Sequence, residues 1–208
     1  MIFFRRLIPV TIFPAFQYIY RMQHPTHNPW KITGEKPVYD NPWINVTEYQ
    51  VINPSGNPGI YGKVHFKNIA IGIMVLDEDF NTYVVGQYRF APDNYSWEIP
   101  EGGGPLGIDA LASAKRELLE ETGLKAAEWT EILRMHLSNS VSDELSIIYL
   151  ARGLEQFEAE PEDTEDLIVN KVPFEEVYQM VCIGEITDSI SVAAILKIKV
   201  MLLEGKLI

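Results

Sequence analysis

A nearly continuous apolar run from Ile69 to Leu76 constrains the fold of this chain more than any other segment. A run of this length is typical of a β-strand that is buried on both faces. Such a strand needs neighbouring strands and a covering layer on each side of the sheet. Helical patterns at residues 109–122, 174–182 and 189–203 can supply those layers. We therefore expect an α/β fold, an α/β/α sandwich built on a mixed β-sheet.

Strand-like stretches lie before and after this run. Trp43–Ile52 and Ile60–Phe66 are rich in β-formers, and the turn-forming residues 53–59 separate them, which predicts a β-hairpin. Residues 23–42 are rich in Pro, His and Asn and predict an irregular lead-in. A glycine- and proline-rich loop is expected over 100–107. Further strands are expected at residues 83–89, 95–99, 129–137, 145–151 and 167–172.

The length of 208 residues suits one domain with an extension. We expect an apolar N-terminal extension over 1–22, a lead-in and hairpin subdomain over 23–66, and the main domain over 67–208. The apolar segment has three interpretations: a terminal extension, a mis-assigned start with Met22 as the true initiator, or a membrane or export signal. Arg5, Arg6 and two prolines interrupt it, and no signal cleavage site follows. We expect a cytoplasmic protein with no membrane partner.

The charge balance narrows the classes of ligand. The chain has 17 Lys and Arg against 29 Asp and Glu, a net charge of −12. Such an acidic protein repels phosphate backbones, so we expect no nucleic-acid partner. An anionic substrate would need a positive mediator, and a bound divalent cation is the obvious one. A single cysteine excludes a disulfide scaffold.

Three carboxylates share one face of the helix expected at 109–122. Glu117, Glu120 and Glu121 are spaced i, i+3 and i+4, so their side chains lie together. Clustered carboxylates repel one another unless a cation neutralises them, and oxygen ligands suit Mg²⁺ or Mn²⁺. Arg116 lies four residues before Glu120 and can hold that carboxylate by a charge-assisted hydrogen bond. Asp109 is placed to cap the start of this helix.

The segment Glu101–Gly104 precedes the helix and carries three consecutive glycines. Without side chains, backbone groups can approach a metal or phosphate closely, and a carbonyl at Glu101 or Gly102 could add a metal ligand. Each pattern alone is common on solvated helices and in turns, but the combination indicates a metal-dependent site.

These residues closely resemble the signature box of the Nudix hydrolase family. Gly102 stands at its start, and Arg116 to Leu124 reproduce its end. One position departs: Ile108 stands where the family has Glu, which puts the rate and the loop geometry in question. The resemblance implies a Nudix-type α/β/α sandwich over 67–208 with an N-terminal β-hairpin subdomain.

Other segments resemble the ADP-ribose pyrophosphatase branch of that family: Gln87–Arg89, Trp97–Gly102, Ser142–Glu144 and Gly184–Asp188. The resemblance implies a homodimer whose hairpins are shared between subunits. It also implies that Trp43 and Tyr61 sandwich adenine, although both could simply pack the hairpin. Arg89 would bind a phosphate, with a surface ion pair as the alternative. Glu98 and Glu144 would complete the substrate-binding set.

The same resemblance implies Mg²⁺-dependent hydrolysis of the diphosphate of ADP-ribose or a related nucleoside diphosphate sugar. The products would be a nucleoside monophosphate and a sugar phosphate. Metal ligands would be Glu101, Glu117, Glu120 and Glu121, and the catalytic set would include Arg116, Glu117, Glu120 and Glu121. A base would come from the acidic segment 155–166, with Glu165 or Glu162 favoured and Asp163 next.

Two alternatives stay open at the level of sequence. The first keeps the chemistry and changes the substrate to GDP-mannose, NADH, a dinucleoside polyphosphate or an mRNA-type cap. The second is a Nudix fold that senses a nucleotide without hydrolysing it, for which Ile108 is the motif-level reason. The sequence does not separate adenine from guanine.

Overall fold

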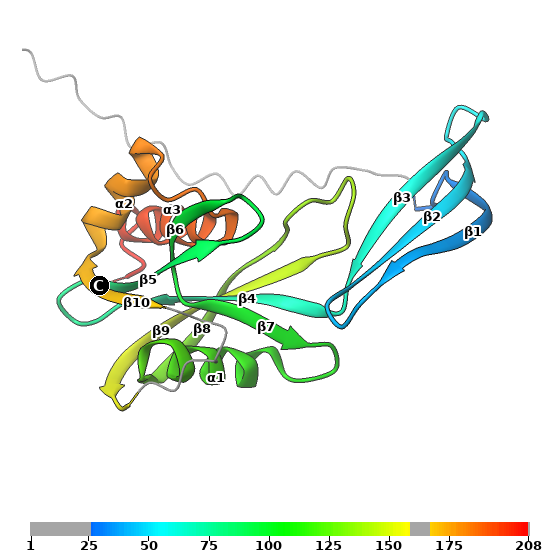
Figure 1. Cartoon of the computed structure of the whole chain (residues 1–208). Helices are drawn as coiled ribbons and strands as arrows, with labels where there is room; N and C mark the ends of the chain where they lie inside the picture. Colours follow the sequence, from blue (N-terminus) through cyan, green and yellow to red (C-terminus); the bar gives the residue numbers. More distant parts are fainter. Residues whose placement is uncertain (1–25, 159–166, 208) are drawn as a thin grey trace, which may run out of the picture.

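The computed structural model describes residues 26–158 and 167–207. The strands and helices form a three-stranded sheet β1-β2-β3, a three-stranded sheet β10-β5-β6 and a four-stranded sheet β7-β4-β9-β8 (Figure 1). Their bounds are β1 Lys31–Asp40, β2 Ile44–Ile52, β3 Pro58–Phe66, β4 Asn68–Val75, β5 Asn81–Arg89, β6 Asn94–Glu98, β7 Glu101–Pro105, α1 Ala110–Thr122, β8 Leu124–His136, β9 Leu145–Gln156, β10 Ile168–Pro173, α2 Phe174–Ile183 and α3 Ser189–Leu203.

The apolar run forms β4, an inner strand of the four-stranded sheet, as expected. It pairs parallel with β9 and antiparallel with β7, so the sheet is mixed. Ile71, Ile73 and Val75 pack toward α1, whereas Met74 and Leu76 belong to a second core with α2 and α3. Figure 1 shows α1 on one side of this sheet and α2 and α3 on the other. The expected α/β/α sandwich is confirmed.

The N-terminal sheet extends away from the sandwich (Figure 1). The hairpin of β2 and β3 is confirmed, and Asn53 stabilises its turn by accepting hydrogen bonds from the amides of Ser55 and Asn57. The expected irregular lead-in is wrong, because its later part forms β1 against β2. The side chains of β1 are largely exposed and its register shifts twice, so it shows no alternation of buried and exposed residues. Only the pairing with β2 defines it as a strand.

The expected loop over 100–107 is also wrong, because Glu101–Pro105 forms β7. Gly102 pairs with Ile71 and Gly103 with Ala70 of β4. Glycine has a low strand propensity, so the sequence gives no strand signal here. β8 begins at Leu124, directly after the left-handed Gly123, rather than at Trp129.

Within the described residues, no helix is both long and apolar enough to cross a membrane. The apolar segment 1–22 lies outside the described residues.

Candidate active site

The helix α1 begins and ends where its capping residues place it. The carboxylate of Asp109 accepts hydrogen bonds from the amides of Leu111 and Ala112, and Gly123 closes the helix in the left-handed conformation with φ 70°. Leu118 is fully buried in the core. This anchoring fixes the rotation of the helix and places its acidic face against β7.

Two of the acidic side chains contact the backbone of β7. The amide of Glu101 donates to Glu121 Oε2 at 3.0 Å. The carboxyl group of Glu117 fills the space in front of Gly102, where an added Cβ would lie 2.2 Å from Glu117 Cδ. Both carboxylates are buried, with Glu121 2% and Glu117 9% exposed. The structure therefore brings together the glycine segment and the helix carboxylates that the sequence singled out.

Arg116 holds the other side of this acidic face. Its Nη1 lies 2.5 Å from Glu120 Oε2, which confirms the expected pairing. Its Nη2 lies 2.5 Å from Glu117 Oε1 and donates to the Gly103 carbonyl oxygen at 3.0 Å. One guanidinium thus ties two carboxylates of α1 to β7.

The carboxylates nevertheless do not converge on one point. Glu117 and Glu120 are paired with Arg116, while Glu121 accepts from the Glu101 amide. Among residues 26–158 and 167–207, no three Asp, Glu, His or Cys side chains form a group that could hold a metal ion. The donor chemistry still fits a hard divalent cation, because Glu101 Oε2 is buried without a hydrogen-bond partner among the described residues. Binding such an ion requires these side chains to turn toward a common point.

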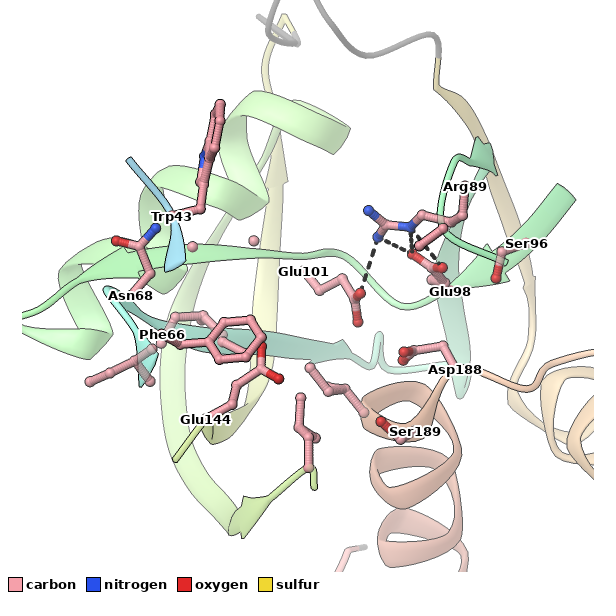
Figure 2. Close-up of a pocket in the computed structure, with 18 of the residues that line it drawn as sticks. Trp43, Phe66, Asn68, Arg89, Ser96, Glu98, Glu101, Glu144, Asp188 and Ser189 are labelled. Carbon is pink, nitrogen blue, oxygen red and sulfur yellow. Dashed lines mark hydrogen bonds and ion pairs between the residues drawn. The ribbon is translucent and has the colours of Figure 1, made fainter. Parts of the chain in front are cut away.

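A cavity of about 860 Å³ opens beside this cluster. It reaches the backbone of β7 at Gly102 and Gly103, next to the carboxyl group of Glu117. Figure 2 shows its two ends, an aromatic end with Trp43, Phe66 and Glu144 and an acidic end with Arg89, Glu98, Glu101 and Asp188.

The acidic end is organised around Arg89. Its Nε donates to both oxygens of Glu98, at 2.9 and 3.0 Å, and its Nη2 lies 3.1 Å from Glu101 Oε1. Glu98 is only 3% exposed and Arg89 is 36% exposed, so the carboxylate of this ion pair is buried in the cavity wall while the arginine is partly open to solvent. Burial, and then the charges of Asp188 and Glu98, raise the pKa of Glu101 well above its ordinary value, against the opposing charge of Arg89.

The aromatic end contains one of the two aromatic residues expected to bind the base. Trp43 is 65% exposed and lines the cavity with Phe66. Tyr61 instead belongs to the N-terminal sheet: its hydroxyl donates to the Ser140 carbonyl oxygen, and its ring meets the edge of Trp30 with centroids 5.4 Å apart. Trp43 and Tyr61 thus hold separate positions within one chain.

The remaining predicted residues have different outcomes. Glu144 lines the cavity, and burial followed by the charge of Asp188 raises its pKa. Glu162, Asp163 and Glu165 lie outside the described residues. Ile108 is 56% exposed in the turn before α1.

Sequence reasoning missed Phe66 and Asp188 as cavity residues. Asp188 carries an N-terminal capping signal, because its carboxylate accepts from the Ser191 amide at the start of α3. Phe66 ends the strand β3 and gives no comparable signal. Its place in the cavity depends on how the N-terminal sheet joins the sandwich.

Comparisons with known proteins agree with this architecture. Residues 66–186 match the family model described as NUDIX domain, and residues 30–64 match that of the nucleoside diphosphate sugar hydrolase N-terminal domain. An ADP-ribose pyrophosphatase of Mycobacterium tuberculosis is 34% identical over 133 residues, which cover 62% of this chain and 64% of that protein. A CMP-5'-(N-acetyl-N-hydroxy-3-aminopropyl)phosphonate hydrolase of Streptomyces rubellomurinus is 28% identical over 160 residues, 77% of each chain.

A solved structure shares the fold. It is described as an ADP compounds hydrolase and has a TM-score of 0.77 at 18% identity, covering 88% of this chain and 98% of its own. The chain spans just under two thirds of the length of the mycobacterial relative.

Proposed function

This chain belongs to the Nudix hydrolase family, and from that membership we propose that it hydrolyses the diphosphate bond of ADP-ribose or a related nucleoside diphosphate sugar. The products are a nucleoside monophosphate and a sugar phosphate. The observation that carries the proposal is the placement of Glu117 and Glu121 of α1 against the backbone of β7, the strand whose residues Glu101, Gly102 and Gly103 line the cavity.

The reaction needs a cation because both the cavity wall and the substrate are negatively charged. Glu117 and Glu121 would hold Mg²⁺ or Mn²⁺, with Glu120 and Glu101 as further ligands. When bound, the ion supplies neutralisation of the diphosphate charge and lowers the pKa of a bound water. Gly102 leaves the space that the Glu117 carboxyl group occupies.

The chain's own residues then bind and orient the substrate. Arg116 steadies Glu117 and Glu120 through its two terminal nitrogens. Arg89 is oriented by the buried Glu98 through Nε and Nη2 and by Glu101 through Nη2, and it would bind a phosphate oxygen in the cavity through its Nη1. Trp43 offers a flat apolar face to the nucleobase, and Glu144 can accept hydrogen bonds from sugar hydroxyls. Glu165 or Glu162 would act as general base.

We also propose that the protein forms a homodimer. The N-terminal sheet exposes large apolar side chains, among them Ile60 at 71%, Ile32 at 64% and Val38 at 58%. Exposed apolar residues on a projecting sheet favour burial against another surface, and a second copy of the sheet would supply one. Light scattering tests this directly, and a monomer at micromolar concentration would contradict it.

Glu121→Gln tests the hydrolase proposal. We expect a loss of kcat of several hundred-fold in Mg²⁺, because a metal ligand supplies several kcal/mol of transition-state stabilisation. Glu128→Gln is the matched control, since Glu128 is exposed on β8. Full activity in Glu121→Gln would show that the mechanism is wrong. A substrate panel of ADP-ribose, GDP-mannose, NADH and dinucleoside polyphosphates, scored by kcat/KM, then identifies the substrate.

The second candidate is a nucleotide sensor, which Ile108 favours because it replaces the family's Glu. Calorimetry distinguishes the two. Tight binding of ADP-ribose without turnover in Mg²⁺ or Mn²⁺ would support the sensor and exclude the hydrolase.

A further inference from the structure

The segment 137–144, which joins β8 to β9, is hydrogen-bonded to β3 of the N-terminal sheet. The amide of Val64 donates to the Val141 carbonyl oxygen at 2.9 Å, and the amide of Asp143 donates to the Val64 carbonyl oxygen at 3.2 Å. An isolated parallel bridge joins Val64 and Ser142. These bonds are not local in sequence, so they form only when the two parts of the fold have come together.

The side chain of Asp143 strengthens this junction. Its Oδ2 lies 2.6 Å from Lys63 Nζ and 2.8 Å from His65 Nδ1, and its Oδ1 accepts from the Phe66 amide at 3.1 Å. Burial alone would raise the pKa of Asp143, but these hydrogen bonds outweigh it and lower the pKa to about 2. The carboxylate is therefore ionised throughout the physiological pH range.

Asp143 is linked to two residues of the cavity wall, one by a hydrogen bond and one by its place in the sequence. It accepts a hydrogen bond from the Phe66 amide on β3, and it directly precedes Glu144 in the segment 137–144. Phe66 and Glu144 both line the aromatic end of the cavity (Figure 2). Trp43 is tied to the same place, because the amide of Lys67, next to Phe66, donates to the Trp43 carbonyl oxygen at 2.9 Å.

We infer that Asp143 is a positioning residue for substrate binding, which sets the separation between the aromatic wall at Phe66 and the carboxylate of Glu144. This inference rests on the proposed function. The side chain of Asp143 contacts Lys63, His65 and the Phe66 amide, none of which belongs to the acidic end around Arg89, so it acts on affinity and leaves the chemical step unchanged. If this wall is disordered in the free protein, part of the binding free energy of the substrate is used to order it, and the apparent affinity falls by that amount.

A merely structural role predicts a different result. Lys63 and Asp143 are 42% and 33% exposed at their side chains, and ion pairs with such exposure contribute little to global stability. If the pair only stabilised the fold, its removal would lower the melting temperature slightly, with KM unchanged. If Asp143 positions the wall, KM rises while kcat is retained.

The test compares Asp143→Ala with Asp77→Ala. Asp77 is a matched control because its pKa is also lowered to about 2, its Oδ2 lies 2.7 Å from Lys171 Nζ, and it accepts backbone hydrogen bonds in the turn between β4 and β5, away from the cavity. For Asp143→Ala we expect KM for ADP-ribose to rise about tenfold, with kcat within about threefold of wild type. Asp77→Ala should lower the melting temperature with KM unchanged. Asp143→Asn keeps an acceptor for the Phe66 amide and should fall between wild type and Asp143→Ala.

Amide hydrogen exchange in residues 137–147, without ligand, gives a second measurement that needs no turnover. Asp143→Ala should exchange faster there, and Asp77→Ala should match wild type. An inactive wild type would refute the proposed hydrolysis alone, and the exchange comparison would still decide the role of Asp143. Unchanged exchange in this segment, or an unchanged KM with a reduced kcat, overturns the inference.

Discussion

Replacing Gly102 with alanine tests the contact on which the candidate site depends. Gly102 lies in β7 with an ordinary strand backbone, so alanine fits the chain conformation. The added Cβ would lie 2.2 Å from Glu117 Cδ and 2.4 and 2.5 Å from its two carboxylate oxygens. Ordinary van der Waals contact begins near 3.4 Å. The carboxyl group must therefore withdraw by more than an ångström.

Such a displacement moves a proposed metal ligand out of its productive position. A misplacement of about 1 Å can cost about 100-fold in rate, which corresponds to about 2.7 kcal/mol of activation free energy. We expect Gly102→Ala to lose roughly that much kcat/KM on ADP-ribose in Mg²⁺. The fold should survive, because the Glu117 carboxyl group can turn aside without disturbing the core residue Leu118.

Gly103→Ala is the matched control. Its Cβ would meet only the end of the Asn68 side chain, at 3.3 Å from Nδ2, which a small rotation relieves. We expect its kcat/KM to stay within about threefold of wild type, as for substitutions that create no clash. Steady-state kinetics and melting temperatures should be measured for both variants. Equal activity of Gly102→Ala and wild type would refute the assignment of Glu117 as a ligand held in front of Gly102.

Three further predictions concern stability and the arginine of the box. Ser191→Ala should lower the free energy of unfolding by about 1–3 kcal/mol in urea denaturation, because the buried Ser191 hydroxyl accepts from the Ile99 amide at 3.0 Å; an unchanged value would contradict this. Asp77→Asn should make the free energy of unfolding depend less on pH in acid. Burial opposes ionisation of Asp77, but hydrogen bonds from Lys171 and Asn81 lower its pKa to about 2. The ionised carboxylate therefore stabilises the fold above the unfolded pKa of 3.8, and this stabilisation is lost as the pH falls toward 2. Acid titrations followed by circular dichroism measure the difference, and identical curves would exclude this role. Arg116→Lys should lose about tenfold in kcat/KM with little change in melting temperature, because an ammonium group cannot hold Glu117, Glu120 and the Gly103 carbonyl oxygen together; wild-type kinetics would count against that role.

The sequence alone determined the elements whose signals are local. The bounds of α1 follow from the capping residues Asp109 and Gly123, and its helical periodicity buries Leu118. The same periodicity places its glutamates on one face. The strand β4 follows from its apolar run, and the β2–β3 hairpin from its turn residues. Capping, periodicity and turn geometry act over a few residues, so they can be read without knowing the rest of the fold.

Only the tertiary structure decided which backbones pair and which surfaces meet. The glycine segment of β7 is a strand because its backbone pairs with β4. Likewise, β1 is a strand because its backbone pairs with β2, although its side chains are largely exposed. Phe66 lines the cavity at a place where its amide donates to Asp143, which is far away in the sequence. The directions of the helix carboxylates were likewise decided by Arg116 and the Glu101 amide. These interactions join residues that are distant in the chain, and their free energy is gained only when the partner segment is already in place.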